Sequence, residues 1–310
     1  MPLRKIKSVQ FTTQDAVKQF IAFKQAQNVS ARTMRDYNFY LAEFIRKTSN
    51  SLDYATLTQD TLQYFADIPN TSPAVFNHRY SNISAFFNWC VKQEIIPKNP
   101  LTVQGLTKKR DDGNIKPASI QDVKILLNSF DKTTYTGLRN YTLTLLMLDT
   151  GIRTSELIQL RNSDFDQSAK QIIIRKTVAK TRLTRILYLS SQTNTAIAQF
   201  IKIKPDDWED WLFPTNEGKY MRITQLDSEY RRACGKVGIK FTPYQLRHTF
   251  ATYFVQNGGD LFTLQDLMGH SDLRMTRRYT EIDNQTKKQQ HDINSPINAL
   301  TGNPRLRKIK

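Results

Sequence analysis

Cysteine is almost absent from this sequence, and long apolar runs are missing. Cys90 and Cys234 are the only cysteines, and neither lies beside a second cysteine or a histidine at a metal-binding spacing. Neither a disulfide framework nor a zinc site is therefore expected, as is typical of a reduced cytoplasmic protein. The most apolar segment, Tyr141 to Leu148, is too short to cross a bilayer, and the N-terminus lacks the apolar stretch of a signal peptide. We expect a cytoplasmic protein without membrane association.

Motifs that handle phosphate through a metal or a nucleotide are also missing. The sequence has no GxxxxGK[ST] loop, no HExxH and no run of carboxylates spaced to hold divalent metals, so we expect no metal and no cofactor. Positive charge, by contrast, is abundant: 45 Lys and Arg residues oppose 28 Asp and Glu residues, a formal charge of +17. This excess predicts a polyanionic partner such as nucleic acid. Any phosphodiester chemistry would then rely on cationic side chains.

The first hundred residues have the pattern of a small helical bundle. Apolar residues recur at spacings of three and four, and no strand-like alternation is found. Asn99-Pro100 is expected to end the helical pattern, because the residue before proline resists the helical region. Helix starts are predicted at Thr12 or Thr13, at Ser30, at Thr58 (running to about Ala66) and at Pro73.

The stretch KKRDDGNIKP, residues 108–117, has charge, glycine and proline but no periodicity, which predicts an exposed linker. Beyond it the pattern is mixed. Two β-branched and apolar runs, at 172–174 and 186–189, predict a strand pair around a basic loop. We therefore expect a mainly α fold with a small antiparallel β-sheet. Further helix starts are predicted at Ser119, Ser155, Thr242 and Ser271.

Four side chains are candidates for phosphate chemistry, and each has an ordinary alternative. Arg153 follows a glycine turn, but could be a surface arginine paired with Glu156. Arg247 begins an amphipathic helix and His270 lies in a turn, where a structural role is common. Tyr279 follows two arginines. A phenol with a pKa of about 10 is a poor nucleophile without such cationic neighbours.

The order of the segments carries more information than any one residue. TGIRTSEL, YQLRHTFAT, LMGHSD and RRYT follow one another along the chain and together resemble the signature of the tyrosine recombinases, the phage integrase family. The resemblance covers residues from about 116 to 290, and the helical region before it resembles the core-binding domain of that family. It implies a helical core-binding bundle followed by an α+β catalytic domain.

The resemblance also implies a role for each matching residue. Arg153 and Arg247 would clamp the scissile phosphate, and His270 would donate a hydrogen bond to it. Tyr279 would attack, giving a 3′-phosphotyrosine bond and a free 5′-hydroxyl. The lysine that serves as general acid in this family lies in a loop between two strands. Aligning the loop by its end, at Arg185, assigns this role to Lys180, whereas aligning it by a lysine-threonine start assigns it to Lys176. We prefer Lys180.

The same loop is rich in positive charge. A second interpretation of Lys176 and Lys180 is that both contact only the DNA backbone. As DNA-backbone contacts we select Arg175, Lys176, Arg182 and Arg185.

One position departs from the family pattern. The usual HxxR motif is YxxR here, with Tyr244 in place of histidine. A phenol can exchange hydrogen bonds with phosphate but does not shuttle a proton near neutral pH as imidazole does. His248 is not expected to substitute, because one residue along a helix turns its side chain about a quarter turn away from Arg247.

These expectations combine into one layout. Residues 1–105 form the helical core-binding (DNA clamp) domain, 106–117 a linker, 118–290 the catalytic domain and 291–310 a basic C-terminal tail. The expected activity is site-specific recombination of double-stranded DNA through a Holliday junction, for integration, excision or resolution. The expected assembly is a tetramer of this chain on two paired sites, joined through the C-terminal tail. Because the N-terminal extension before the first predicted helix is short, we expect no arm-site domain of the kind that many phage integrases carry.

Two other functions share parts of this pattern. A type IB topoisomerase uses the same cleavage chemistry but relaxes supercoils as a monomer, and the helical N-terminal region argues against it. A DNA-binding protein that has lost catalysis would fit Tyr244, yet such a protein would be expected to have lost one of the other four candidates as well.

Overall fold

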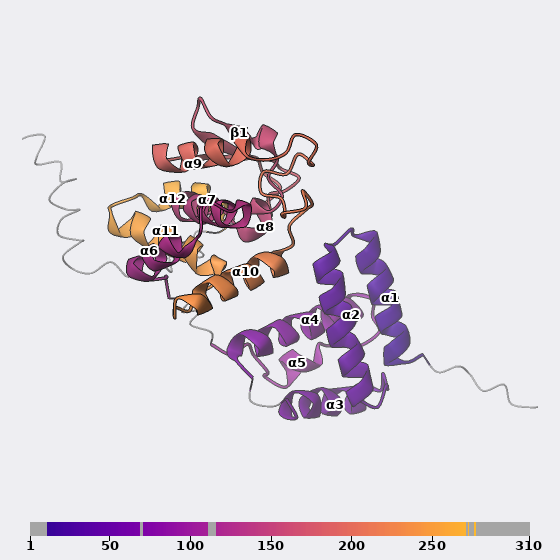
Figure 1. The fold of residues 1–310 in the computed structure, drawn as a ribbon. Coiled ribbons are helices and arrows are strands. Elements are labelled where there is room, and N and C mark those ends of the chain that lie inside the picture. The colour runs from indigo at the N-terminus through magenta and orange to yellow at the C-terminus, as the bar shows by residue number, and fades with distance from the viewer. Residues whose placement is uncertain (1–10, 69–70, 111–115, 271, 273–275, 277–310) are drawn as a thin grey trace, which may run out of the picture. The chain divides into compact units, whose positions relative to one another are not determined.

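The computed structural model describes residues 11–68, 71–110, 116–270, 272 and 276. The chain divides into two compact units, residues 1–114 and residues 115–310. In Figure 1 the helices of the first unit are coloured indigo to purple, and the elements of the second run from magenta to yellow. Within the part of the chain described, no helix combines the length and the apolar character needed to span a membrane.

The first unit is a bundle of helices, and each helix begins at a polar residue. The side chain of each N-cap accepts a hydrogen bond from a backbone N–H of the first turn, which satisfies a donor that the helix itself leaves unpaired. The helices, each with its cap, are α1 (Thr13–Ala26, Thr12), α2 (Ala31–Lys47, Ser30), α3 (Tyr54–Ala66, Asp53), α4 (Pro73–Lys92, Ser72) and α5 (Pro100–Val103, Asn99).

Aromatic side chains fill the core of this bundle. Phe20, Phe44, Phe86 and Phe87 are fully buried. Phe20 meets Phe86 edge-on at 5.7 Å between ring centroids, and Phe44 meets Phe87 in the same way at 5.6 Å. Burying a side chain of this size contributes about 1.5–3 kcal/mol, so the apolar stripes of α1, α2 and α4 hold the bundle together.

Two boundaries differ from the sequence-based prediction. Helix α3 begins at Tyr54 rather than Thr58, because the Asp53 carboxylate accepts from the backbone N–H of Thr56 and starts the helix one turn earlier. Pro100 begins the short helix α5 rather than only ending a helical pattern. Proline fits the first turn of a helix, where its missing N–H would have no partner.

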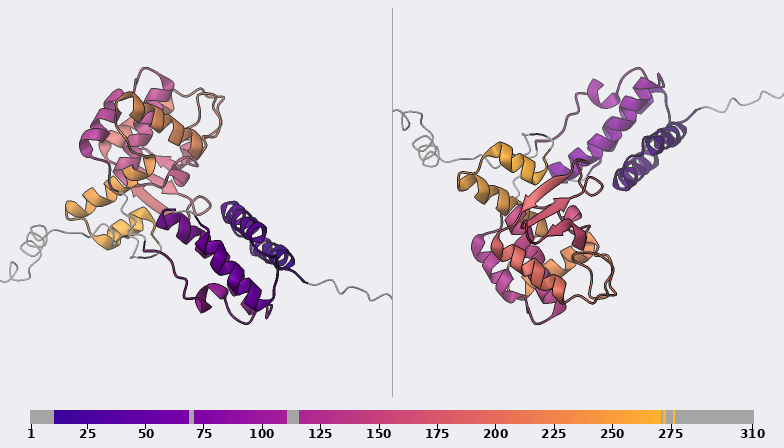
Figure 2. Two further views of the ribbon diagram at one scale, coloured as in Figure 1. Left: turned by 90° about the horizontal axis from the view of Figure 1, so that it is seen from below. Right: turned by 90° about the horizontal axis from the view of Figure 1, so that it is seen from above.

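In its described residues, the second unit combines helices with one small sheet. The strands lie in the order β1-β2-β3, and both pairs are antiparallel, with Ile172 opposite Leu187. Figure 2 shows the strands as one small sheet. The mainly α fold with a small antiparallel sheet is therefore confirmed. The elements are α6 (Ile120–Ser129), α7 (Tyr135–Thr150), α8 (Thr154–Leu157), η1 (Asn162–Asp164), β1 (Phe165–Asp166), β2 (Gln171–Ile174), β3 (Arg185–Tyr188), α9 (Ser191–Lys202), α10 (Ile223–Lys236), α11 (Pro243–Gln256) and α12 (Leu261–Met268).

The packing of α7 against α11 brings distant segments together. Leu146 of α7 and Leu246 of α11 are fully buried in one apolar core. Helix α7 ends at Gly151, whose φ of +61° is left-handed and whose Cβ position would lie 2.4 Å from the ring of Phe250 in α11. Only glycine allows both this backbone conformation and this close approach. The turn after α7 therefore lies directly against α11.

Candidate active site

Arg153 follows the Gly151 turn and is held by two contacts. Its Nη1 lies 3.0 Å from Oε1 of Glu156, and its Nη2 donates to the carbonyl of Gly269 at the end of α12. The side chain is 15% exposed and that of Glu156 is fully buried. The pairing with Glu156 that the sequence suggested therefore exists, but it lies inside the protein rather than on its surface.

Arg247 is buried in the first half of α11, with 4% of its surface exposed. Its Nη1 donates to the carbonyl of Gly151, and its Nη2 donates to the carbonyl of Met268 at 2.8 Å. Nη2 also lies 3.0 Å from Nε2 of His270. One guanidinium thus joins the end of α7, the end of α12 and the candidate histidine.

His270 follows Gly269, which ends α12 in the left-handed conformation. Arginine can only donate, so the contact with Arg247 makes Nε2 the acceptor and leaves the ring proton on Nδ1. Nδ1 lies 2.9 Å from Oγ1 of the buried Thr276 and donates to it in this tautomer. Thr276 stands three residues before Tyr279 in the sequence. Tyr279 itself lies outside the described residues.

Three arginines meet at the C-terminal end of α12. The carbonyls of Leu267, Met268 and Gly269 accept from Arg185, Arg247 and Arg153, respectively. The last carbonyls of a helix have no partner within it and carry partial negative charge, so they attract cations. This helix end holds three guanidinium groups close together, an arrangement suited to an anion such as phosphate.

Glu156 is the carboxylate within this cluster. It accepts from Arg153 and, through both oxygens, from Arg185, at 3.0 and 2.6 Å. Burial acts to raise the pKa of Glu156, but the hydrogen bonds and charges of Arg185 and then Arg153 outweigh it, so this pKa lies below its usual value. The carboxylate is therefore charged at neutral pH and offsets part of the repulsion between the two guanidinium groups.

Tyr244 is exposed, unlike the largely buried arginines of this cluster. It is 47% exposed in the first turn of α11, and its ring meets the ring of His248 edge-on at 4.7 Å. His248 is 2% exposed. The structure thus brings Tyr244 and His248 together, while Arg247 points to the ends of α7 and α12.

The basic residues of the β2–β3 loop fall into two groups. Lys176, Lys180 and Arg182 are exposed. Arg175 pairs with Asp164 at 2.7 Å and donates to the carbonyl of Gln159, and Arg185 contacts Glu156 and Leu267 as described. Because both lysines are exposed, their burial does not distinguish them as general acid.

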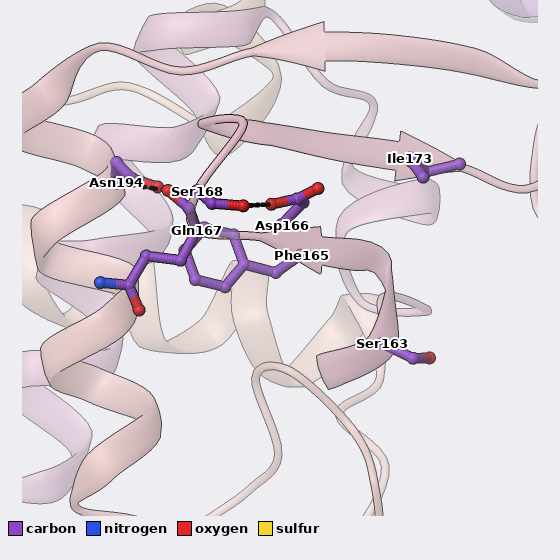
Figure 3. Close-up of a pocket in the computed structure, with 7 residues that line it drawn as sticks. All are labelled: Ser163, Phe165, Asp166, Gln167, Ser168, Ile173 and Asn194. Carbon is purple, nitrogen blue, oxygen red and sulfur yellow. Dashed lines mark hydrogen bonds between the residues drawn. The ribbon is translucent and has the colours of Figure 1, made fainter.

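A separate pocket lies beside the first two strands. Figure 3 shows it between β1, β2 and the side chain of Asn194, with the hydroxyl of Ser168 hydrogen-bonded to Asp166. None of the residues that line it is cationic, and its carboxylate would repel a phosphate. The residues that could bind phosphate lie instead around the end of α12. Among the described residues, no group of three or more His, Cys, Asp or Glu side chains could hold a metal ion.

Comparison with known proteins identifies the relatives of this chain. The phage integrase family matches residues 120–286. Tyrosine recombinase XerC of Chlamydia pneumoniae is 33% identical over 228 residues, which cover 70% of each chain. Tyrosine recombinase XerD of Listeria monocytogenes is 26% identical over 283 residues, 86% of this chain and 94% of the relative. The chain belongs to the phage integrase family.

Membership confirms the resemblance to the tyrosine recombinases and the expected enzyme class, a tyrosine-type DNA strand transferase. Solved structures of the family have the same fold. The Tn1549 transposon integrase in complex with a circular intermediate DNA matches with a TM-score of 0.74 and 20% identity, over 91% of this chain and 99% of that chain. A lambda integrase dimer bound to a core site matches with a TM-score of 0.71 and 14% identity, over 85% and 97%.

Proposed function

We propose that this protein is a site-specific DNA recombinase in which Tyr279 attacks the scissile phosphate. The attack forms a 3′-phosphotyrosine bond and releases a 5′-hydroxyl, and the reverse attack by another 5′-hydroxyl rejoins the strands. The phosphotyrosine bond conserves the energy of the phosphodiester, so the reaction uses neither ATP nor metal. Strands are exchanged through a Holliday junction between two paired sites.

The observation that carries this proposal is the cluster at the end of α12. Arg153, Arg247 and His270 come from three separate segments and meet within hydrogen-bond distance of one helix end. Backbone carbonyls and Glu156 fix the two guanidinium groups before any substrate binds. Donors held in this way stabilise the charge that develops on a phosphate in the transition state without reorganising.

Each site residue predicted from the sequence has a proposed part in the reaction. Arg153 and Arg247 grip the two non-bridging phosphate oxygens, since a guanidinium fork matches phosphoryl geometry. His270 binds the same phosphate through Nε2. In the structure Nε2 accepts from Arg247, so it must first take up a proton in order to donate to the phosphate. Tyr244 accepts or donates a hydrogen bond near the phosphate. Lys180 donates the proton to the leaving 5′-oxygen.

Double-stranded DNA is the proposed partner. The net charge of +17 supplies contacts to phosphates, which set affinity, and a smaller number of base contacts select the site. We propose that the helical domain (1–105) and the catalytic domain (118–290), connected by a linker (106–117), both contribute such contacts. In the β2–β3 loop we propose Lys176 and Arg182, which are both exposed, as contacts to the DNA backbone. Arg175 is a weaker candidate, because it already pairs with Asp164. The protein would act in the cytoplasm as a tetramer, joined through the basic tail (291–310).

A suicide-substrate assay tests the proposal. A nicked duplex that loses its short 5′-hydroxyl fragment after cleavage traps the covalent intermediate. We expect the intact protein to form an adduct that survives denaturing electrophoresis, at the same rate with and without EDTA. DNA binding without any adduct on nicked sites would contradict recombination and favour a DNA-binding function. Relaxation of supercoiled plasmid without paired sites would favour a topoisomerase.

The assignment of the general acid gives a separate prediction. Lys180→Ala is expected to lower the cleavage rate by about 10²-fold, within the usual range for general acid catalysis. A substrate with 5′-sulfur at the scissile bond should restore the rate, because a thiolate leaves without protonation. Lys176→Ala is the matched control from the same loop, and rescue of that variant alone would transfer the role to Lys176.

Gly269 is predicted to be required for the geometry of the cluster. Its φ is +61°, and an added Cβ would lie 3.1 Å from Nη1 of both Arg153 and Arg185. Gly269→Ala is therefore expected to lower stability by about 1–2 kcal/mol and to slow cleavage by on the order of 10-fold through displaced guanidinium groups. Thermal unfolding and single-turnover cleavage measure the two effects.

Gly238→Ala is the control for this prediction. Gly238 also has a positive φ, +72°, but an added Cβ there meets nothing within 4 Å. It should lose similar stability and keep its cleavage rate. Equal slowing in both variants would show that backbone strain, rather than crowding of the arginines, is responsible.

A further inference from the structure

We propose that Arg185 is a positioning residue and that it does not bind the DNA backbone. It fixes the phosphate clamp, which is Arg153 and Arg247, relative to the β2–β3 loop, which contains Lys176 and Lys180. This inference rests on the proposed recombinase function. It replaces the expectation, drawn from the sequence, that Arg185 contacts a DNA phosphate. Its basis is the set of partners that the side chain has inside the protein.

All three nitrogens of the Arg185 guanidinium have protein acceptors. Nε donates to the carbonyl of Leu267 at 3.0 Å, and Nη1 and Nη2 donate to the two carboxylate oxygens of Glu156 at 3.0 and 2.6 Å. The side chain is 11% exposed. A bidentate pair with a fully buried carboxylate is among the strongest contacts that arginine makes. Turning this guanidinium toward a DNA phosphate would break the pair and leave a buried charge with one partner fewer.

The partners of Arg185 are also those of the clamp. Glu156 is bound by Arg153 as well, at 3.0 Å. The carbonyls of three successive residues at the end of α12 accept from these arginines: Leu267 from Arg185, Met268 from Arg247 and Gly269 from Arg153. Arg185 therefore fixes both the carboxylate that orients Arg153 and the helix end that carries His270.

Arg185 also begins β3 and so ends the loop that contains both candidate lysines. It lies opposite Ile174, the last residue of β2, in the sheet register. The Arg185 side chain therefore joins this end of the loop to Glu156 and to the end of α12. We infer that this connection places the leaving-group lysine relative to the phosphate that Arg153 and Arg247 hold.

The chemistry of the contact requires arginine in particular. Lysine carries the same charge but presents one nitrogen, which cannot reach a carbonyl and two carboxylate oxygens together in a fixed plane. Arg185→Ala removes both the positive charge and the planar set of donors, whereas Arg185→Lys keeps the charge and removes only the planar set. The pair of variants separates orientation of the clamp from its net charge.

The test measures affinity and chemistry separately in the suicide-substrate assay. For Arg185→Ala we expect the DNA dissociation constant to stay within about twofold of the wild type, since the side chain is not a backbone contact. Single-turnover cleavage at saturating DNA should fall by about 10²-fold, the scale of a misplacement near 1 Å. Arg185→Lys should recover part of that loss, to about 10-fold below wild type. Arg231→Ala, an exposed arginine of α10, removes the same charge and should leave both quantities within about twofold.

A double-mutant cycle tests whether the effect passes through Glu156. If Arg185 acts by holding that carboxylate, Arg185→Ala combined with Glu156→Gln should slow cleavage little more than the slower single variant. Fully additive slowing would contradict this route. All variants are assayed well below their melting temperatures, and if Arg185→Ala does not fold, Arg185→Lys carries the same test.

Two results would overturn the inference. One is a folded Arg185→Lys or Arg185→Ala protein that cleaves at the wild-type rate. The other is weakened binding with an unchanged rate at saturation and a slope of log K against log salt that is smaller by about one, the behaviour of a lost phosphate contact. If the wild type itself forms no adduct, the recombinase proposal has failed, and the cleavage rates of the Arg185 variants cannot be compared with it.

Discussion

Tyr279→Phe is expected to abolish the covalent protein–DNA adduct and to leave DNA binding unchanged. The substitution removes only the hydroxyl oxygen that would become bonded to phosphorus, and the phenylalanine side chain has no nucleophilic atom to form that bond. Denaturing electrophoresis of the trapped complex measures the adduct, and fluorescence anisotropy measures binding.

A second tyrosine provides the control. Tyr253 is 38% exposed on α11 in the same unit, so Tyr253→Phe removes an equivalent hydroxyl without touching the proposed chemistry. It should form the adduct at the wild-type rate. If the adduct persists in Tyr279→Phe, another residue is the nucleophile.

Arg247→Ala is expected to reduce cleavage by at least about 10²-fold, the cost of losing one preorganised donor to a charged transition state. It should also lower stability, because the carbonyls of Gly151 and Met268 would each lose a buried partner, at about 1–3 kcal/mol for each acceptor left unsatisfied. Single-turnover cleavage and thermal unfolding give the two values.

Arg247→Lys separates these two effects. Lysine keeps the positive charge and can satisfy one carbonyl, but it cannot bridge Gly151, Met268 and His270 together. We expect it to recover more stability than cleavage. A folded Arg247→Lys or Arg247→Ala protein that cleaves within tenfold of the wild type would show that this arginine does not bind the reacting phosphate.

The fold could be predicted where the signals are local. Caps at Ser30, Ser119 and Thr242, and the proline at 73, mark helices that the structure contains. The hydroxyls of Ser30 and Ser119 accept from the first turn of their own helices, whereas at Thr242 the backbone N–H donates to the side chain of Gln245.

Helix α10 was not predicted. Its N-cap is Arg222, whose side chain makes no capping bond; the backbone N–H of Arg222 donates instead to the side chain of Gln225. The start of α10 therefore lacks the short polar N-cap residue by which most of the other helix starts were predicted.

The site could be predicted only in part, for a related reason. Arg153, Arg247 and His270 stand in short segments whose order along the chain is recognisable, and the structure brings these three together. The role of Glu156 as a shared partner of Arg153 and Arg185 was not predicted, since Glu156 and Arg185 lie far apart in the sequence and meet only through tertiary packing. For the same reason the contacts of Arg185 with Leu267 and Glu156 were not predicted from its place at the end of a basic loop.

The most direct test of the central claim is to locate the covalent bond. Trypsin cleavage after Arg278 and Lys287 releases residues 279–287, YTEIDNQTK, in which Tyr279 is the only tyrosine. We predict that mass spectrometry of the trapped adduct, after nuclease and trypsin digestion, finds the added nucleotide on Tyr279 of this peptide. A nucleotide attached to any other residue would contradict the account.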